Sequence, residues 1–322
     1  MLLLSRADVA RLMDFPAYVD AVEAGFRAAA CGKALAPPAT GFAVPGGSYH
    51  AKGAVLLGDT VAIKINANFP GNPASNGLPT VQGVIYLSDA RNGRPLALMD
   101  SIEITINRTG AATTLAARHL ARPDCRVAMI CGAGVQGRIQ LRAIAAAVTL
   151  ERVHVWDRDG DRAERYAREM SDAMGLDVRP ARDLAIARDA GIIVTCTSAR
   201  TAFLTPALVS PGTFVAAVGA DNRDKHEIAA DLYAACRVTV DSLEQAAEIG
   251  DLHHALACGA VSREHVHATL AELVSRTKAG RASAADVTLF DSTGIGLQDV
   301  AAATAVYRRA LAAGAGQRFS LA

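Results

Sequence analysis

The fold of this chain is decided by residues 125–161, CRVAMICGAGVQGRIQLRAIAAAVTLERVHVWDRDGD. The short, mostly apolar run 126–131 predicts a buried strand. The Ala-rich run 138–148 predicts a helix, and residues 152–156 predict a second strand. A strand, a helix and a second strand in close succession are typical of the βαβ unit of an α/β fold.

Three glycines and one acid make this unit a candidate dinucleotide site. Gly132, Gly134 and Gly137 form a G-x-G-x-x-G pattern between the first strand and the helix. The first permits a tight turn, the second lets the backbone approach a pyrophosphate, and the third lets helix and strand pack closely. The helix N-terminus would face the phosphates, and Asp157 would accept hydrogen bonds from the adenosine ribose. A glycine turn that binds no ligand is the alternative interpretation.

The composition is typical of a globular enzyme with substantial cores. The chain has 322 residues, of which 51% are hydrophobic and 20% charged, and this length has room for one large domain or two ordinary ones. Its formal net charge is +1. An overall charge this small gives no electrostatic footprint for nucleic acid or for an anionic membrane, so neither is an expected partner.

The N-terminus and the cysteines favour a cytoplasmic location. The chain starts MLLLSRAD, in which charge follows three leucines directly, unlike a signal peptide, and no apolar run approaches membrane-spanning length. No C-x-x-C pair occurs, so we expect reduced core thiols rather than a disulfide framework. The six cysteines are Cys31, Cys125, Cys131, Cys196, Cys236 and Cys258.

The first hundred residues predict two helices and then an antiparallel sheet. Residues 5–8, SRAD, resemble a capping box that opens a short helix. Residues 16–31 show an apolar stripe at helical spacing and are followed by Gly32. Between residues 40 and 98, strand-like runs alternate with turn sequences rich in Gly, Pro and Asn.

One of these strands, VAIKINANF at residues 61–69, alternates between apolar and polar side chains. Because successive side chains in a strand point to opposite faces, the two classes lie on opposite sides of the sheet. Val61, Ile63, Ile65 and Phe69 point one way, and Lys64, Asn66 and Asn68 point the other. His50 and Lys52 likewise share a face. By pattern alone, a solvated polar sheet face is the simplest interpretation.

The predicted helix 101–121 carries an isolated arginine. Between Glu103 and Arg118 the only charged residue is Arg108. A guanidinium on an otherwise apolar helix needs an anionic partner if it is buried. Arg108 is therefore either part of a structural ion pair or a receptor for a substrate carboxylate, which its planar fork suits.

After residue 161 the β–α rhythm continues, which predicts a doubly wound parallel sheet. Strands are expected near Val178 and at residues 192–195, 214–218, 238–240 and 286–290, with intervening helices and a helical stretch from 246 to 277. Asp221 follows a strand's carboxyl end, where ligands bind in such sheets. A last helix, 297–312, is expected to return to the first domain.

Two histidine pairs, His253–His254 and His265–His267, are interpreted as surface residues of the 246–277 helix. Neither pair has carboxylate or thiolate neighbours at the spacing of a metal site. No metal is expected.

Several separated segments, in order along almost the whole chain, resemble the ornithine cyclodeaminase/mu-crystallin family. They are AIKINANFPGN around Lys64, GLPTVQG with Thr80, ITINRTGAATTLAARHLAR around Arg108, GAGVQGRIQ, VGADNRDKHE around Asp221, and FDSTGIGLQDVAAA. The resemblance implies an NAD(P)-dependent enzyme that transfers hydride between nicotinamide and a nitrogen-bearing α-carbon. It also implies a homodimer of two-domain subunits.

The domain assignment and the site residues follow from the same resemblance. Residues 1–118, completed by 297–322, would form an α+β domain for substrate binding and dimerisation, and 119–296 a Rossmann-type domain. Lys64 and Asp221 would be catalytic. Substrate would be bound by Arg108, Lys64, Thr80, His50, Lys52 and Gly294. The dinucleotide would be bound by Gly132, Gly134, Val135, Gln136, Gly137, Asp157, Arg158, Cys196, Thr197, Val218 and Thr109.

Two departures from the family pattern bear on the substrate. Many members carry an arginine in the loop after the second helix, where this chain has only PPAT at residues 37–40. Ornithine cyclodeaminases place an acid in the following strand, where the comparable stretch of this chain is YHAK at residues 49–52, with Lys52. A lysine there would repel the distal ammonium of ornithine. His50 and Lys52 would instead favour a carboxylate or a polar side chain.

Three functions and two cofactors therefore stay open. The leading interpretation is an imine reductase or amino-acid dehydrogenase acting on a small amino acid or 2-imino acid. A cyclodeaminase with catalytic NAD is the second, and a non-catalytic binding protein is the third. Asp157 favours NAD because its charge opposes a 2′-phosphate, whereas Arg158 could pair with the phosphate of NADP.

Overall fold

The computed structural model describes residues 1–320 and divides them into two compact units. The first unit is Met1–Ala111 together with the segment that starts at Ile295, and the second unit is Ala112–Gly294. The first boundary lies inside helix α4 (Ile102–Leu120), earlier than the predicted boundary after residue 118. The second lies after residue 294 rather than 296.

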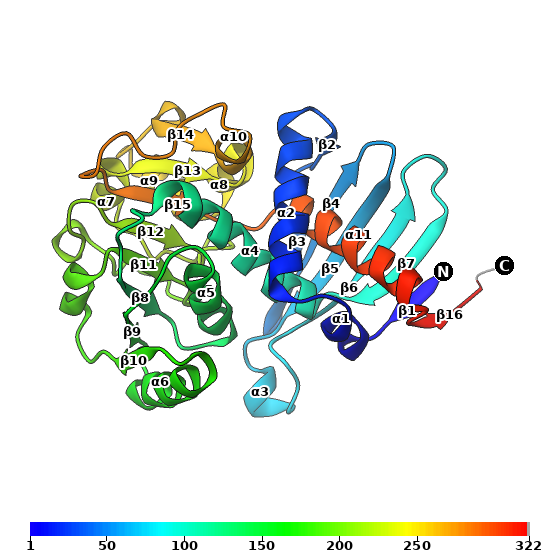
Figure 1. The fold of residues 1–322 in the computed structure, drawn as a ribbon, viewed down its shortest axis with the longest axis horizontal. Helices are drawn as coiled ribbons and strands as arrows, with labels where there is room; N and C mark the ends of the chain where they lie inside the picture. Colours follow the sequence, from blue (N-terminus) through cyan, green and yellow to red (C-terminus); the bar gives the residue numbers. More distant parts are fainter. Residues whose placement is uncertain (321–322) are drawn as a thin grey trace. The chain divides into compact units, whose positions relative to one another are not determined.

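The first unit is a mixed sheet with helices packed on it (Figure 1). Its strand order is β16-β1-β7-β6-β5-β4-β2, with β3 paired to β4, and β3 to β7 are antiparallel as predicted. The strands are β1 (Leu2–Leu4), β2 (Ala34–Leu35), β3 (Thr40–Val44), β4 (Gly47–Leu56), β5 (Thr60–Asn68), β6 (Val81–Asp89), β7 (Pro95–Asp100) and β16 (Gln317–Arg318). The helices are α1 (Arg6–Leu12), α2 (Phe15–Ala30), α3 (Asn72–Ser75) and α11 (Gly296–Ala313), with the first part of α4.

Local signals set the first helices. Ser5 caps α1 because its Oγ accepts from the Asp8 N–H at 3.2 Å while Asp8 Oδ2 accepts from the Ser5 N–H at 3.0 Å, the predicted capping box. Asp14 caps α2, and Gly32, with φ 68°, follows the end of that helix. The leucines at the N-terminus, for which no strand was predicted, form β1 and pair in parallel with β7.

The α11 helix packs on β4 and β5 and against α2. Two glycines permit this close contact. A Cβ at Gly25 of α2 would lie 2.8 Å from the Ala301 Cβ, and a Cβ at Gly296 would overlap the backbone of Gly53. Glycine at both positions therefore lets α11 lie directly on the sheet and on α2.

The alternation in β5 is present, but the expectation of a solvated polar face is wrong. Lys64 and Asn66 are buried, whereas Ile63 and Ile65 are 42% and 48% exposed. The polar face is buried because α11 covers it and supplies Asp299 as a partner for Lys64. The apolar face of β5 is the one that this chain leaves open.

The second unit is an eight-stranded, wholly parallel sheet in the order β10-β9-β8-β11-β12-β15-β13-β14. The strands are β8 (Val127–Cys131), β9 (Arg152–Trp156), β10 (Asp177–Pro180), β11 (Ile192–Thr195), β12 (Phe214–Ala217), β13 (Arg237–Val240), β14 (Val266–Thr269) and β15 (Thr288–Asp291). From β8 the chain adds β9 and β10 on one side of the sheet and then returns to add β11 and β12 on the other side. The position between β8 and β11 is therefore the switch point of a doubly wound Rossmann-type sheet. The predicted fold class is confirmed.

Helices surround this sheet in Figure 1. They are α5 (Val135–Ala145), α6 (Gly160–Met174), α7 (Ala230–Ala235), α8 (Leu243–Glu248), α9 (Asp251–Ala257) and α10 (Leu270–Val274), with the 3-10 helices η1 (Leu184–Asp189), η2 (Pro206–Leu208) and η3 (Arg263–His265). Among the described residues only η1 and η2 directly precede β11 and β12, so the helices predicted there are reduced to short 3-10 helices of six and three residues.

The prediction of continuous helix from 246 to 277 is wrong. The segment breaks at Gly250 and Gly259, both at positive φ, and contains η3 and the edge strand β14. β14 is only four residues long and pairs with β13 alone. A strand this short at the edge of a sheet has too few residues to show a clear strand pattern in its sequence. His265 and His267 accordingly lie on η3 and β14 rather than on a helix.

Candidate active site

The glycine-rich loop has the shape that its sequence predicts. Gly132 has φ 116°, and a Cβ there would lie 2.8 Å from the Cys196 carbonyl oxygen. Helix α5 begins at Val135, earlier than predicted, with Gly134 as an N-cap that has no side-chain capping bond. The first N–H groups of α5 therefore lack an acceptor from a capping side chain, as expected where a phosphate completes the helix N-terminus.

The third glycine is needed for packing. A Cβ at Gly137 would overlap the carbonyl of Gly132, and Tyr166 of α6 donates its hydroxyl to the Gly137 carbonyl at 2.8 Å. The loop is thereby held between α5 and α6, so that its backbone is in place before any ligand binds.

Asp157 contacts the glycine-rich loop directly. Its Oδ2 accepts from the Ala133 N–H at 2.8 Å, and its Oδ1 accepts from the Asp159 N–H at 3.0 Å. A carboxylate has about four acceptor positions, so room remains for ribose hydroxyls. Arg158 is exposed on the next position.

A buried acid absent from the sequence-based predictions ties two strand ends together. Glu227 accepts from the Thr197 N–H at 2.6 Å, the Thr197 hydroxyl at 2.7 Å and the Gly219 N–H at 2.9 Å. Burial raises the pKa of Glu227, and these hydrogen bonds oppose the rise. Glu227 thus orders the segments that follow β11 and β12, where Thr197 and Val218 were expected to meet a dinucleotide.

Cys196 is a packed thiol in the same region. Its Sγ lies 3.3 Å from the Cys131 carbonyl oxygen, and burial raises the pKa of the Cys196 thiol. Because the thiolate is the reactive form, this environment supports a structural side chain rather than a nucleophile.

Asp221 lies on an exposed stretch of the loop that Glu227 anchors. Lys225 places its Nζ 2.7 Å from Asp221 Oδ1. The end of the loop is fixed by Asp251 of α9, whose Oδ1 accepts from the Glu227 N–H at 2.8 Å and the Ile228 N–H at 2.9 Å. The predicted catalytic acid is therefore accessible and held on a fixed support within the second unit.

In the first unit, Lys64 and Arg108 meet at one buried carboxylate. Lys64 Nζ lies 2.9 Å from Asp299 Oδ1 and 2.8 Å from Oδ2. Arg108 donates from Nε to Asp299 Oδ1 at 3.1 Å and from Nη1 to Gln298 Oε1 at 2.7 Å. Within residues 1–320 the Nη2 group of Arg108 has no hydrogen-bond acceptor, so two guanidinium donors remain for a ligand.

The charges in this cluster shift one another's proton affinity. Burial lowers the pKa of Lys64 to about 7, with the Arg108 and Lys52 charges acting in the same direction and Asp299 opposing them. Burial by itself would raise the pKa of Asp299, but Lys64 and Arg108 hold it below its usual value. Lys64 is therefore poised to exchange a proton near neutral pH.

Several other predicted substrate residues also lie in the first unit. Lys52 is directly opposite Lys64 in the β4–β5 register, and His50 is opposite Asn66, so all four side chains share one face. Thr80 is half-buried in the turn before β6. Thr109, expected at the dinucleotide, is buried on α4 and donates its hydroxyl to the Thr105 carbonyl at 2.7 Å.

Gly294 closes the second unit. It has φ 69°, its N–H donates to Asp241 Oδ2 at 2.6 Å, and its carbonyl accepts from Gln245 Nε2 at 3.1 Å. The turn after β15 is thus held by residues from two other segments of the same unit.

Asp299 and Gln298 are the residues of this cluster that sequence reasoning missed. Both belong to the last segment that resembles the family, FDSTGIGLQDVAAA, but pattern alone gave them no role. An acid in the first turn of a helix is favoured by the helix dipole and is usually interpreted as a capping charge. Asp299 is buried beside Lys64 because α11 packs on the sheet, and this packing cannot be predicted from a local sequence pattern.

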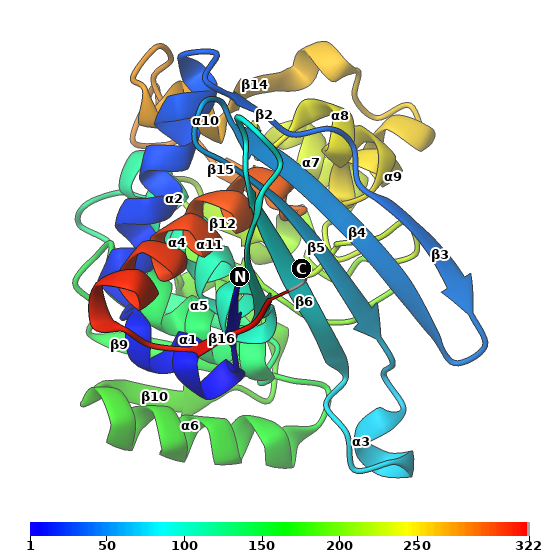
Figure 2. The same cartoon turned by 90° about the vertical axis from the view of Figure 1, so that its right-hand side faces the viewer.

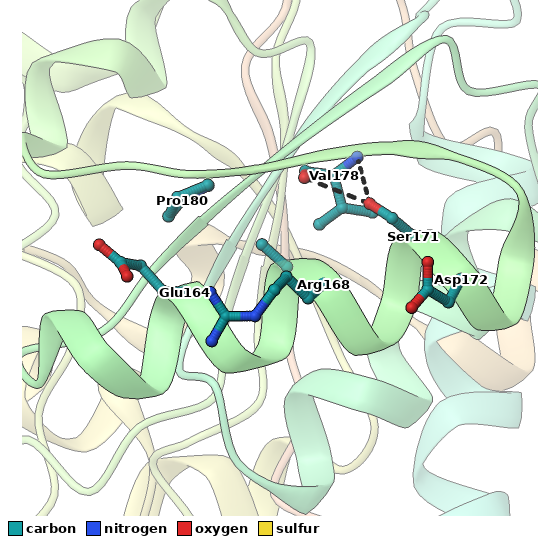
Figure 3. Close-up of a pocket in the computed structure, with 7 residues that line it drawn as sticks. Glu164, Arg168, Ser171, Asp172, Val178 and Pro180 are labelled. Atoms are coloured by element: carbon teal, nitrogen blue, oxygen red, sulfur yellow. Dashed lines mark hydrogen bonds between the residues drawn. The ribbon is translucent and has the colours of Figure 1, made fainter.

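A separate hollow lies in the second unit. The hollow between α6 and β10 is about 470 Å³ in volume. Figure 3 shows Glu164, Arg168 and Asp172 among the residues that line it. It contains no residue of the glycine-rich loop, and we assign it no function. Within residues 1–320, no group of three or more acidic, histidine or cysteine side chains is arranged to hold a metal ion, and no helix is long and apolar enough to cross a membrane.

The chain matches the ornithine cyclodeaminase/mu-crystallin family over residues 1–314. It belongs to that family. Among solved structures, Thermococcus litoralis Delta(1)-pyrroline-2-carboxylate reductase in complex with NADH and L-proline is 33% identical, with a TM-score of 0.95 over 99% of this chain and 100% of that one.

Two further relatives have different substrates. An archaeal alanine dehydrogenase dimer with bound NAD is 34% identical, with a TM-score of 0.95 over 100% of this chain and 99% of that one. The iminosuccinate reductase of Paracoccus denitrificans in complex with NAD+ is 30% identical, with a TM-score of 0.92 over the same shares. The family fold thus extends over almost the whole chain, and the three relatives named here carry the names of three different activities.

Proposed function

We propose that this protein is an NAD(H)-dependent oxidoreductase that acts on the C–N bond at the α-carbon of a small amino acid or 2-imino acid. The observation that carries the proposal is the cluster of Lys64 and Arg108 on Asp299 in the first unit. A buried guanidinium with unused donors beside a lysine of lowered pKa suits a substrate with one carboxylate and one basic nitrogen.

Each residue of the cluster has a distinct proposed role. Arg108 would bind the α-carboxylate through Nη2 and so fix the α-carbon. Lys64 would stabilise negative charge at the reacting centre and exchange a proton near pH 7. Asp221 of the second unit would take the proton released by the amine, or return it to the imine nitrogen.

The second unit fits a dinucleotide. Gly132 and Gly134 leave the backbone open to a pyrophosphate, α5 has no side-chain cap, and Asp157 beside them suits a ribose diol. When bound, NAD(H) would supply the hydride chemistry. We propose NAD(H) over NADP(H) because the Asp157 charge opposes a 2′-phosphate, and the relatives described above with a bound dinucleotide carry NAD+ or NADH.

The proposed substrate has no distal ammonium. Lys52, which lies opposite Lys64, contributes to lowering the pKa of Lys64 and so adds positive charge to the pocket. This charge would repel the distal ammonium of ornithine or lysine and attract a carboxylate or a polar group of the substrate. His50 would bind the same substrate group. Thr80 is proposed to line the same pocket, and Gly294 stays a predicted substrate residue of the second unit.

We also propose a homodimer formed through the open face of the first unit's sheet. Figure 2 shows the long neighbouring strands β3 to β6. Their open face carries Phe42, Ile63, Ile65 and Val84, which are 40–65% exposed. A contiguous apolar strip of this kind is typical of a protein interface, and the archaeal alanine dehydrogenase with this fold is a dimer.

A substrate panel tests the function. Amino acids with NAD+ or NADP+, and keto acids with ammonia or amines plus NADH or NADPH, are followed by absorbance at 340 nm and by ammonia release. We expect a steady 340 nm change with NAD(H). Cyclic product and ammonia without net 340 nm change would identify a cyclodeaminase, and ligand binding without turnover would identify a binding protein.

Replacing the proposed acid tests the mechanism. We expect Asp221→Asn to lower kcat by about 100-fold or more, because proton transfer at the nitrogen is lost, with NADH binding unchanged in a fluorescence titration. Asp224→Asn is the matched control, since Asp224 is exposed in the same loop and its carboxylate lies 3.8 Å from Arg200 Nη2. Unchanged kcat in Asp221→Asn would reject the assigned role.

A further inference from the structure

A single carboxylate serves two basic groups that come from two different elements. Lys64 lies on β5, Arg108 on α4, and Asp299 on α11. Lys64 is in contact with both Asp299 oxygens, and Arg108 with one of them. All three side chains are at least nine-tenths buried.

We propose that Asp299 is a positioning residue that sets the spacing of Lys64 and Arg108 and favours the ammonium form of Lys64 over the neutral amine. This role rests on the proposed function of the cluster. Asp299 would not itself touch the reacting atoms. It would act through Lys64 and Arg108, which would contact the substrate.

Asp299 is held firmly enough to set such a spacing. It lies in the first turn of α11, where the helix dipole stabilises a carboxylate. That turn is fixed to the sheet because Gly296 packs against the Gly53 backbone. One turn further on, Thr304 and Thr60 share a buried hydrogen bond of 2.6 Å between α11 and β5.

The charge on Lys64 depends on Asp299. The groups that face the Lys64 ammonium are Arg108 and the Thr105 hydroxyl on α4, Lys52 on β4, and Asp299 on α11. Burial and the two positive neighbours favour the neutral amine, and Asp299 supplies the opposing negative charge. Without Asp299, the pKa of Lys64 would fall further, because burial and the two positive neighbours would act unopposed.

Lysine NMR tests this directly, because the chain contains only five lysines, Lys33, Lys52, Lys64, Lys225 and Lys278. In protein labelled with 13C at the lysine ε-carbon, Lys64→Met identifies the Lys64 signal. We expect the Lys64 titration midpoint to fall by at least about one pH unit in Asp299→Asn. An unchanged midpoint in a folded Asp299→Asn protein would overturn the proposal.

Kinetics add a second readout. In a plot of kcat/KM against pH, one apparent pKa should report the titration of Lys64. In Asp299→Asn this apparent pKa should move to lower pH by the same amount as the NMR midpoint. Thr304→Val is the matched control, since it removes a buried hydrogen bond of the same helix without touching the cluster. It should lower Tm and leave the pH profile in place, and a shifted profile in Thr304→Val would mean that any weakening of α11 suffices.

A third variant keeps the proposal testable if Asp299→Asn does not fold. Asp299→Glu retains the negative charge but moves the carboxylate by one methylene. We expect its Lys64 midpoint to stay near that of the wild type while kcat/KM falls by about tenfold or more, as for a misplaced catalytic group. Unchanged kcat/KM would contradict the positioning role.

The NMR measurement needs no substrate, so the two proposals fail separately. A substrate panel with no turnover would reject the proposed function and leave the Lys64–Asp299 coupling to be judged by NMR. If the enzyme is active but the Lys64 titration midpoint is the same in the wild type and in Asp299→Asn, only the positioning role is rejected.

Discussion

A charged lysine as buried as Lys64, a residue that is 3% exposed, is stable only where an anion lies beside its ammonium. Asp299 supplies that anion, and Arg108 shares it. Removing one member of a buried ion cluster leaves an uncompensated charge, which costs roughly 3–5 kcal/mol. The residues that carry the proposed chemistry are therefore also interdependent for stability, and substitutions among them should keep charge wherever possible.

Arg108→Lys is a substitution that keeps the charge beside Asp299 and tests the role of one residue. We expect it to fold, because the positive charge beside Asp299 is kept, but to raise KM for the amino or imino acid by about 10–100-fold. A lysine lacks the planar fork that can bond Gln298, Asp299 and a carboxylate together. Steady-state kinetics and Tm measure the effect, with the exposed Arg168→Lys as control. A KM equal to that of the wild type would remove Arg108 from substrate binding.

At the scale of elements, the site in each unit depends on contacts between elements far apart in sequence. Glu227 orders the segments after β11 and β12 through Thr197 and Gly219. Gly219 leaves just enough room for this acid, since a Cβ there would lie within 3.0 Å of the Glu227 carboxylate. The edge of the sheet where the dinucleotide is proposed to bind is therefore built around one buried side chain.

Gly219→Ala should disturb that edge. We expect the displaced Glu227 carboxylate to lose its hydrogen bonds, with a loss of about 1–3 kcal/mol in the free energy of unfolding and weaker NADH binding. Thermal unfolding and a fluorescence titration with NADH measure the two effects. Gly160→Ala is the matched control, because a Cβ at Gly160 meets no atom within 4 Å. Equal stability of the two variants would show that Glu227 can shift without cost.

At the scale of the whole molecule, the first unit's sheet has two unlike faces. One is covered by α11 and contains Lys64, and the other leaves Ile63 and Ile65 nearly half exposed. Apolar area buried between two copies is worth roughly 25 cal/mol per Å² before the cost of association is subtracted. A second copy on this face is the proposed reason that apolar residues remain there.

Ile65→Lys should weaken that association. A charge placed in an apolar interface must be desolvated, so we expect the dimer dissociation constant to rise by about tenfold or more. Size-exclusion chromatography with light scattering over a dilution series measures it. Leu311→Lys on α11 replaces a leucine of equal exposure, 48%, away from the open face and should leave the dimer intact. A dimer that persists unchanged in Ile65→Lys would place the interface elsewhere.

Local sequence patterns determined much of this protein. The glycine spacing, the strand runs around it and Asp157 depend on backbone geometry and on neighbours within one βαβ unit, so they were predictable and the Rossmann-type fold is confirmed. The same holds for the capping box at Ser5 and the antiparallel strands between residues 40 and 98. These features are set by interactions that span few residues along the chain.

Only the tertiary structure decided which face of β5 is buried, because alternation defines two faces without saying which one a distant helix will cover. It also decided the partners of Lys64 and Glu227. Asp299 is separated from Lys64 by most of the chain, and Gly219 and Thr197 reach Glu227 only once β11 and β12 lie side by side. Charge pairs made across such distances leave no periodic trace in the sequence, since their geometry exists only after packing.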